Sequence, residues 1–227
     1  YDVVKDGKIK DDDRLIKSLP TIQYALEHNP KQIILIAHNG RPKGVDQSLS
    51  LRPCVDWLKE KLSQDIGFVD DCQADSIPEE PQVILLENLR FYEGEKKNEP
   101  AFAQKLASYA DVYISNAFAT AHRAHASMVG IPEHLDSYAG LILQKEVEML
   151  SKVTSNPERP FHVLVGFAKL SDKIKMLENM LKQADKVLIG GAVVFTFYKA
   201  QGKEVGQSLC AQEDLELANS LLNDYKD

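Results

Sequence analysis

Short apolar runs alternate along the chain with longer segments in which apolar residues recur every three or four positions. The short runs predict buried strands, and the longer segments predict helices with one apolar face. We expect strands at residues 32–37, 82–86, 111–115, 161–165 and 186–189. We expect helices at residues 53–62, 99–109, 144–152, 172–182 and 214–222. This alternation is typical of α/β folds, in which helices cover a parallel sheet.

Two prolines interrupt the pattern within residues 156–160, which read Asn-Pro-Glu-Arg-Pro. Proline disfavours helical geometry in the residue before it and cannot donate a backbone hydrogen bond. The segment therefore separates a helix from the strand that follows. We expect a domain boundary here, with the preceding helix as the connection and as the place of a hinge.

Composition narrows the class of protein. The 227 residues, of which 44% are hydrophobic and 27% charged, can bury a substantial core. The longest apolar runs have the length of strands, so we expect no membrane span. A net charge of -7 argues against a broad nucleic-acid surface. Cys54, Cys72 and Cys210 are too widely spaced for a disulfide framework or a zinc site, so we expect a cytoplasmic protein.

Arginine side chains follow three of the expected strands, where an open parallel sheet binds its ligand. They are Arg41, Arg90 and Arg123, and Arg14 joins them from the start of a further helical segment. We expect these arginines to gather at one sheet edge together with His38 and His122. Arginine binds phosphate and carboxylate through paired hydrogen bonds, so the expected ligand is a small polyanion.

A simpler interpretation stays open for each of these side chains. Any one arginine could be a surface charge, or could form a salt bridge with Glu87 or Asp11. His38 and His122 could be ordinary capping residues, and we expect His125 to be structural.

A glycine turn and two lysines follow the fourth expected strand. Residues 166–174 read Gly-Phe-Ala-Lys-Leu-Ser-Asp-Lys-Ile, and Ser171 or Asp172 is the expected cap of the next helix. Backbone N–H groups at a helix start, with Lys169 and Lys173 on one face, suit a nucleotide phosphate. Small residues at 190–192 would let a flat base approach the backbone. The alternative is a tight turn with solvated lysines.

Taken together, these motifs resemble the phosphoglycerate kinase family in order and spacing. The most specific strings are Leu-Glu-Asn-Leu-Arg-Phe at 86–91 and Thr-Ala-His-Arg-Ala-His-Ala-Ser at 120–127, and the resemblance covers essentially the whole chain. It implies an α/β protein of two Rossmann-like three-layer domains with parallel sheets, the second incomplete in this chain. The implied division is 1–139 for a domain that binds 3-phosphoglycerate, 140–157 for a hinge helix and 158–227 for the start of a nucleotide-binding domain.

The resemblance also implies an activity, which is reversible phosphoryl transfer between 1,3-bisphosphoglycerate and ADP in glycolysis or gluconeogenesis. It assigns the acid to Asp2, Arg14, His38, Asn39, Gly40, Arg41, Arg90 and Arg123. It assigns the nucleotide to Gly166, Phe167, Ala168, Lys169, Lys173, Gly190 and Gly191. Arg14 and Lys169 would be catalytic at the transferring group. Mg²⁺ would be bound through the nucleotide ATP or ADP, with its protein ligand outside this chain, and we expect a monomer that binds neither nucleic acid nor membrane.

Several positions depart from the family pattern. They are Asp2 and Asn116, which stand where Asn and Asp are usual, Asn39 where Leu is usual, and Ala119, Phe167 and Ala192 where Gly is usual. Phe167 could narrow the adenine pocket. These departures leave two alternatives open: a catalytically weakened relative that acts as a binding or scaffold protein, and a phosphate-binding α/β module with another ligand.

Overall fold

The chain forms two compact units in the computed structural model, Tyr1–Met149 (unit 1) and Leu150–Asp227 (unit 2). The structure describes residues 3–225, so the predicted acid contact of Asp2 lies outside the described residues. Among the helices of residues 3–225, none combines the length and the hydropathy that a bilayer-spanning segment needs.

The main sheet of unit 1 has three parallel strands in the order β3 (Ile33–Leu35), β5 (Val83–Leu86) and β4 (Ile66–Val69). All four residues of the central strand β5 are buried. Val83 and Leu85 belong to one apolar cluster of unit 1, whereas Ile84 and Leu86 belong to the other. Because alternate residues of a strand point to opposite faces, β5 lies between two cores, as a strand covered on both sides should.

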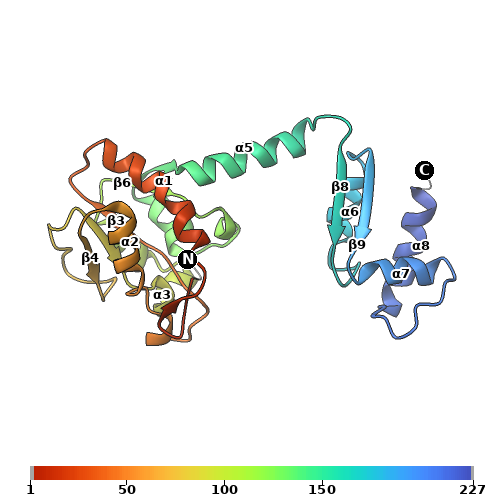
Figure 1. Ribbon diagram of the computed structural model, residues 1–227, viewed down its shortest axis with the longest axis horizontal. Helices are drawn as coiled ribbons and strands as arrows, with labels where there is room; N and C mark the ends of the chain where they lie inside the picture. Colours follow the sequence, from red (N-terminus) through yellow and green to blue (C-terminus); the bar gives the residue numbers. More distant parts are fainter. Residues whose placement is uncertain (1–2, 226–227) are drawn as a thin grey trace. The chain divides into compact units, whose positions relative to one another are not determined.

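Helices and short turns surround this sheet. α2 (Cys54–Leu62) packs against β4 and α1 (Asp13–Glu27) against β3 (Figure 1). The remaining helical elements of unit 1 are α3 (Glu93–Lys97), α4 (Pro100–Ala107), η1 (Gln47–Leu49), η2 (Leu89–Phe91), η3 (Phe118–Thr120), η4 (Ala126–Gly130) and η5 (Ile131–Glu133). Two further strand pairs are β1 (Val4–Lys5) with β2 (Lys8–Ile9), antiparallel, and β6 (Val112–Ser115) with β7 (Asp136–Ala139), parallel.

The first turn of α5 (Leu141–Ser155) is held by side chains from two other elements of unit 1. Asn116, directly after β6, accepts hydrogen bonds on Oδ1 from the N–H groups of Ile142 and Leu143, at 3.1 and 3.4 Å. The N–H of Leu141 donates to Oγ1 of Thr21 in α1, at 3.1 Å. These bonds satisfy backbone donors that a helix start leaves without partners.

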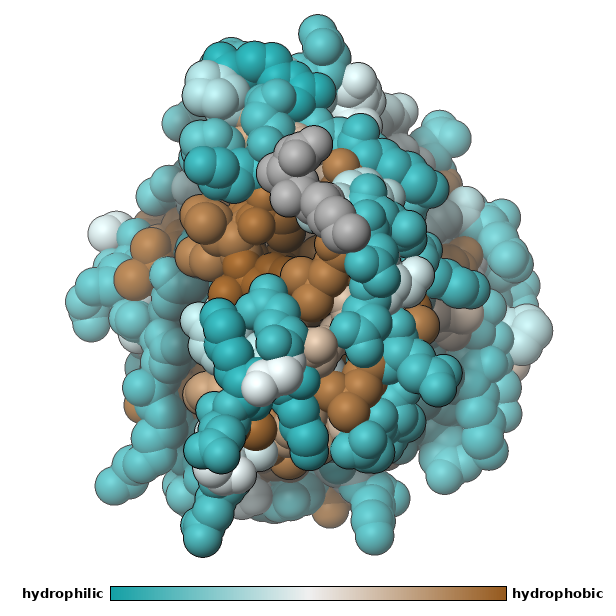
Figure 2. All heavy atoms as spheres, turned by 90° about the vertical axis from the view of Figure 1, so that its right-hand side faces the viewer, coloured by the Kyte–Doolittle hydropathy of each residue, from teal (hydrophilic) through white to brown (hydrophobic). Residues whose placement is uncertain are grey.

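Unit 2 is built on two parallel strands, β8 (His162–Gly166) and β9 (Lys186–Gly190). Its helical elements are α6 (Ile174–Leu181), α7 (Val193–Ala200), η6 (Gln212–Asp214) and α8 (Leu215–Asp224). Both α6 and α7 contact β9, and Leu177 of α6 is fully buried in the core. The other face of the two strands exposes the paired residues Leu164 and Leu188, at 76% and 49%. Figure 2 shows hydrophobic residues gathered in a hollow on the face turned to the viewer.

The expected parallel α/β architecture is confirmed. Each expected strand and helix matches an observed element, with ends that shift by up to three residues. The pattern missed the strands β1, β2, β4 and β7 and the helices α3 and α7. The expected cap of α6 was wrong: the helix begins at Ile174, Lys173 stands at its N-cap position, and neither Ser171 nor Asp172 caps it.

Candidate functional site

The ends of β3 and β5 are joined by the buried amide of Asn88. Its Oδ1 accepts hydrogen bonds from the N–H groups of Asn39 and Arg90, at 3.0 and 3.1 Å. Its Nδ2 donates to the carbonyl oxygens of Asn39 and Leu49, at 2.8 and 3.0 Å. One side chain thereby fixes the junction that carries Arg41 relative to the junction that carries Arg90.

Asn39 is 1% exposed and its amide group is used by the backbone. Nδ2 donates to the carbonyl oxygens of Val4 and Leu49, at 2.7 and 3.2 Å, and Oδ1 accepts from the N–H of Val4 at 3.2 Å. The polar side chain at this position therefore holds β1 and the segment at Leu49 against the junction after β3. A direct contact of this amide with a ligand, as we predicted, would compete with those bonds.

Gly40 and Arg90 contact each other at the same edge of the sheet. Gly40 has φ +64°, a backbone conformation that side chains with a Cβ rarely adopt. Its carbonyl oxygen accepts a hydrogen bond from Nη1 of Arg90 at 2.5 Å, and Arg90 is 4% exposed. Glu87, the salt-bridge partner that we considered for an arginine, instead accepts bonds from the Ser50 hydroxyl and the Leu51 N–H, at 2.6 and 2.8 Å.

A cavity of about 530 Å³ lies at this edge and brings the four predicted arginines together. Its lining comprises Val4, Lys5, Arg14, Asn39, Gly40, Arg41, Leu49, Arg90, Ala119, Thr120 and Arg123. The guanidinium groups come from four segments: the first turn of α1, the junction after β3, the junction after β5 and the segment after η3. Their positive charges favour an anionic ligand with several acceptor oxygens.

The two predicted histidines are not among the lining residues of this cavity. His122 is exposed, whereas His38 is partly buried and its ring lies edge-on to the ring of His125, with centroids 6.3 Å apart. The His125 side chain is 12% exposed, and its Nδ1 lies 3.5 Å from Oε1 of the fully buried Glu95. We had expected only a structural role for His125, and the buried carboxylate beside it was not foreseen.

The predicted nucleotide residues of unit 2 meet where β8 and β9 end. Gly166 and Gly190 are register partners, and the N–H of Val193 donates to the carbonyl oxygen of Phe167 at 3.0 Å. Gly191 has φ +70°, and a Cβ added to it would lie 3.1 Å from both N and O of Phe167. This close approach of two backbones requires glycine at 191. The Phe167 side chain is half-buried and packs against the core of unit 2.

A buried carboxylate, which the sequence pattern did not reveal, holds the turn that carries Lys169. Asp214 is fully buried, and its two oxygens accept hydrogen bonds from the N–H groups of Leu170 and Ser171, at 2.7 and 3.1 Å. Nζ of Lys169 lies 3.8 Å from Oε1 of Glu213. Since α6 begins only after Lys173, our expectation that Lys169 and Lys173 share one helix face was wrong.

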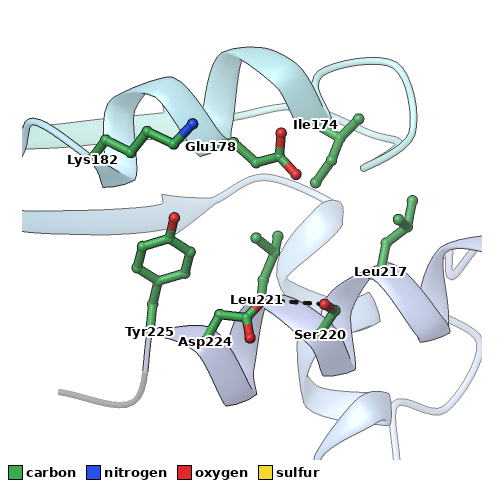
Figure 3. A pocket seen from close by; sticks show the side chains of 8 residues that line it. All are labelled: Ile174, Glu178, Lys182, Leu217, Ser220, Leu221, Asp224 and Tyr225. Carbon is green, nitrogen blue, oxygen red and sulfur yellow. Dashed lines mark hydrogen bonds between the residues drawn. The ribbon is translucent and has the colours of Figure 1, made fainter.

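A separate cavity of about 240 Å³ lies in unit 2, between α6 and α8 (Figure 3). Ile174, Leu217 and Leu221 contribute apolar surface, and Glu178, Lys182 and Asp224 contribute charges. The hydroxyl of Ser220 donates to Asp224 at 3.2 Å. None of the predicted nucleotide residues lines this cavity, so it is separate from the turn at Lys169.

Comparison with known sequences shows the family to which the chain belongs. The sequence model described as phosphoglycerate kinase matches residues 1–227. The phosphoglycerate kinase of Thermosipho africanus is 47% identical over 231 residues, which cover 99% of this chain and 57% of that protein. The enzyme of that name from Anaeromyxobacter sp. is 48% identical over 226 residues, with 95% and 57% covered.

Solved structures are similar as well. The phosphoglycerate kinase of Coxiella burnetii matches with a TM-score of 0.88 and 38% identity, covering 98% of this chain and 57% of that chain. The enzyme from Pyrococcus horikoshii matches with a TM-score of 0.81 and 29% identity, covering 98% and 60%. The chain thus spans somewhat more than half the length of the relatives it matches. With the family model matched from residue 1 to residue 227, the chain belongs to the phosphoglycerate kinase family.

Proposed function

We propose that the full-length protein transfers a phosphoryl group reversibly between 1,3-bisphosphoglycerate and ADP, and that unit 1 binds 3-phosphoglycerate. The observation that carries this proposal is the cavity lined by Arg14, Arg41, Arg90 and Arg123. A ligand with a carboxylate at one end and a phosphate at the other offers enough acceptor oxygens to pair with several guanidinium groups. Gly40 contributes through its backbone, and His38 contributes from the side of His125.

The chemistry needs positioning more than proton transfer. The acceptor is a carboxylate, which is already ionised at neutral pH, so no general base is required. What remains is to align the two oxygens and to neutralise the charge of the group in transfer. We assign this catalytic work to Arg14 in unit 1 and to Lys169 in unit 2, and we assign Asn39 the task of positioning the junction after β3.

On the nucleotide side, a backbone surface with few side-chain atoms suits a flat base. It is formed by Gly166, Ala168, Gly190 and Gly191. Lys169 and Lys173 would contact the phosphates. Phe167 supports this assignment better than we expected, since its ring packs against the core. We therefore propose that Phe167 shapes the turn without closing the base-binding surface.

Magnesium would enter with the nucleotide. The described residues at the Lys169 turn do not fit the ion, because Asp214 uses both oxygens for the backbone of Leu170 and Ser171, and Glu213 lies beside Lys169. A divalent ion of this kind needs free oxygen ligands. We derive no step through it.

The division into an acid domain at 1–139, a hinge helix at 140–157 and a nucleotide domain at 158–227 is part of the same proposal. Arg14 and Lys169 can act on one phosphoryl group only if the units close on the ligands, which would also exclude water from an acyl phosphate. We further propose a monomer in the cytoplasm that binds neither nucleic acid nor membrane.

A coupled assay of the full-length protein with ATP and 3-phosphoglycerate tests the proposal. Arg14→Ala should lower kcat by at least about a hundredfold, because a charge that stabilises the transferring group is lost. Arg52→Ala is the matched control: this arginine is exposed and pairs with Asp70 outside the cavity, so its loss should leave kcat unchanged. Intact binding of 3-phosphoglycerate without turnover in the wild type would favour a binding protein. Failure to bind it at millimolar concentration would favour another phosphorylated ligand.

A further inference from the structure

A fully buried carboxylate lies next to the arginine cluster of unit 1. Glu95, in α3, accepts two hydrogen bonds from Ser127, on Oε2 from the backbone N–H at 3.0 Å and on Oε1 from the hydroxyl at 2.6 Å. Oε1 also lies 3.5 Å from Nδ1 of His125, just beyond the length of a good hydrogen bond. Since a carboxylate oxygen has two lone pairs, Oε1 of Glu95 can accept a further hydrogen bond when Nδ1 of His125 carries a proton.

Positive groups from several elements face His125. They are Arg90 after β5, Lys96 of α3, and His122 and Arg123 after η3, and the ring of His38 after β3 lies edge-on to it. Burial first, and these charges next, lower the pKa of His125 below its ordinary value. Burial raises the pKa of Glu95, against the opposing effect of its bonds from Ser127 and of Arg90. In the free protein the surroundings therefore disfavour a charged imidazole beside Glu95.

Binding of an anion changes this balance. Arg90 and Arg123 act on His125 and also line the acid cavity, so the negative charges of a bound ligand would offset the positive charges that disfavour its protonation. Nδ1 would then carry a proton at the position where Oε1 of Glu95 can accept it. We propose that His125 and Glu95 form a proton-accepting pair, which takes up a proton from the solvent when the cavity binds a phosphorylated carboxylic acid.

The inference rests on the proposed function, and it predicts in which direction the affinity for the acid changes with pH. The pKa of His125 is lower in the free protein than in the complex, so binding takes up a proton at pH values between the two. Across that window the affinity for the acid falls as the pH rises. The phosphate of the ligand has its second pKa near ~6, so measurements at about pH 7.5 keep its own titration out of the result.

Calorimetric titration of the full-length protein with 3-phosphoglycerate, in two buffers of different ionisation enthalpy at about pH 7.5, measures the uptake. We expect a net uptake of protons on binding by the wild type, and loss of this uptake in His125→Gln. Glu95→Gln keeps the shape and an acceptor for Ser127, and should reduce the uptake at least about twofold. His134→Gln, which changes an exposed histidine of the same unit outside the cavity, should leave it unchanged.

The outcomes separate the two proposals. A titration without binding heat at millimolar ligand would contradict the proposed function, whereas binding with a heat that does not depend on the buffer would overturn this inference alone. If circular dichroism shows that a variant has not folded, an NMR titration of the wild-type imidazoles decides instead. The His125 pKa should rise on adding 3-phosphoglycerate. An unchanged pKa would overturn the proposal that His125 and Glu95 take up a proton.

Discussion

Asn39 illustrates how a polar side chain can be buried at low cost. Each polar group of its amide has a backbone partner, either Val4 of β1, 35 positions away, or Leu49, the last residue of η1, 10 positions away. A leucine of similar size at this position would make only apolar contacts, whereas the amide of Asn39 makes three hydrogen bonds. Such exchanges are close to neutral when every donor and acceptor is satisfied and costly when one is not.

Asn39→Ala should therefore destabilise unit 1. The change leaves the N–H and carbonyl of Val4 without their side-chain partner in a buried place, which costs about 2 to 4 kcal/mol of unfolding free energy. Urea denaturation of the full-length protein measures the loss. Gln104→Ala, on the exposed face of α4, is the control and should change the free energy by less than about 0.5 kcal/mol. Equal stabilities of the two variants would show that the Asn39 amide contributes nothing.

A glycine can be required for two reasons, a left-handed backbone and a close neighbour, and two glycines of unit 2 differ in these reasons. Gly191 has both, whereas Gly202 has φ +79° with no atom within 4 Å of an added Cβ. The pair separates the cost of conformation from the cost of contact. Conformation alone costs a residue with a Cβ about 1 kcal/mol.

Gly191→Ala should weaken ADP binding by at least about tenfold, because the new Cβ must displace the backbone of Phe167 in the turn that carries Lys169. Gly202→Ala should lower the stability of unit 2 by about 1 kcal/mol and leave ADP binding unchanged. Isothermal calorimetry with ADP and thermal unfolding provide the two measurements. Equal ADP affinities in both variants would remove the turn from the nucleotide site.

The sequence pattern predicted the elements in which the apolar residues of the sequence are also the buried residues of the structure. The run at 82–86 is apolar throughout and forms the doubly covered β5. β7 escaped prediction because all four of its residues are exposed, and α7 because its Val-Val-Phe-Thr-Phe start favours strands. The start of α6 was misplaced because Asp214, some forty residues further along the chain, holds the turn that Ser171 and Asp172 were expected to cap.

The candidate acid site was predictable for a similar reason. Parallel strands bring their carboxyl ends to one edge, so the meeting of Arg41 after β3 with Arg90 after β5 follows from the sequence pattern. Arg123 follows β6, which pairs with β7 outside that sheet, so this rule does not explain its place in the cavity. The hydrogen-bond network beneath the arginines could not be predicted from the sequence. Asn88 and Glu95 form their bonds with residues that no local sequence pattern connects to them.

The two units have separate cores, and this separation has consequences for the full-length protein. Leu58 of α2 belongs to a core of unit 1 and Leu177 of α6 to the core of unit 2, and both are fully buried. Replacing either leucine by alanine removes a comparable amount of apolar surface and should cost about 2 to 5 kcal/mol in its own unit.

Leu177→Ala should therefore lower ADP affinity while 3-phosphoglycerate still binds, and Leu58→Ala should do the reverse. Titration of each variant of the full-length protein with each ligand, near the temperature at which the weakened unit begins to unfold, gives the four measurements. The loss of both ligands in both variants would mean that the units unfold as one.

The anchored start of α5 also bears on the order of folding. During synthesis Thr21 and Asn116 leave the ribosome before Leu141, so the acceptors for the first turn of α5 can be in place before the helix exists. Forming that first turn is the costly step of helix formation, and ready acceptors reduce its cost. The helix would then grow outward from a finished unit 1, which explains why it begins at Leu141, three residues before its apolar periodicity suggests.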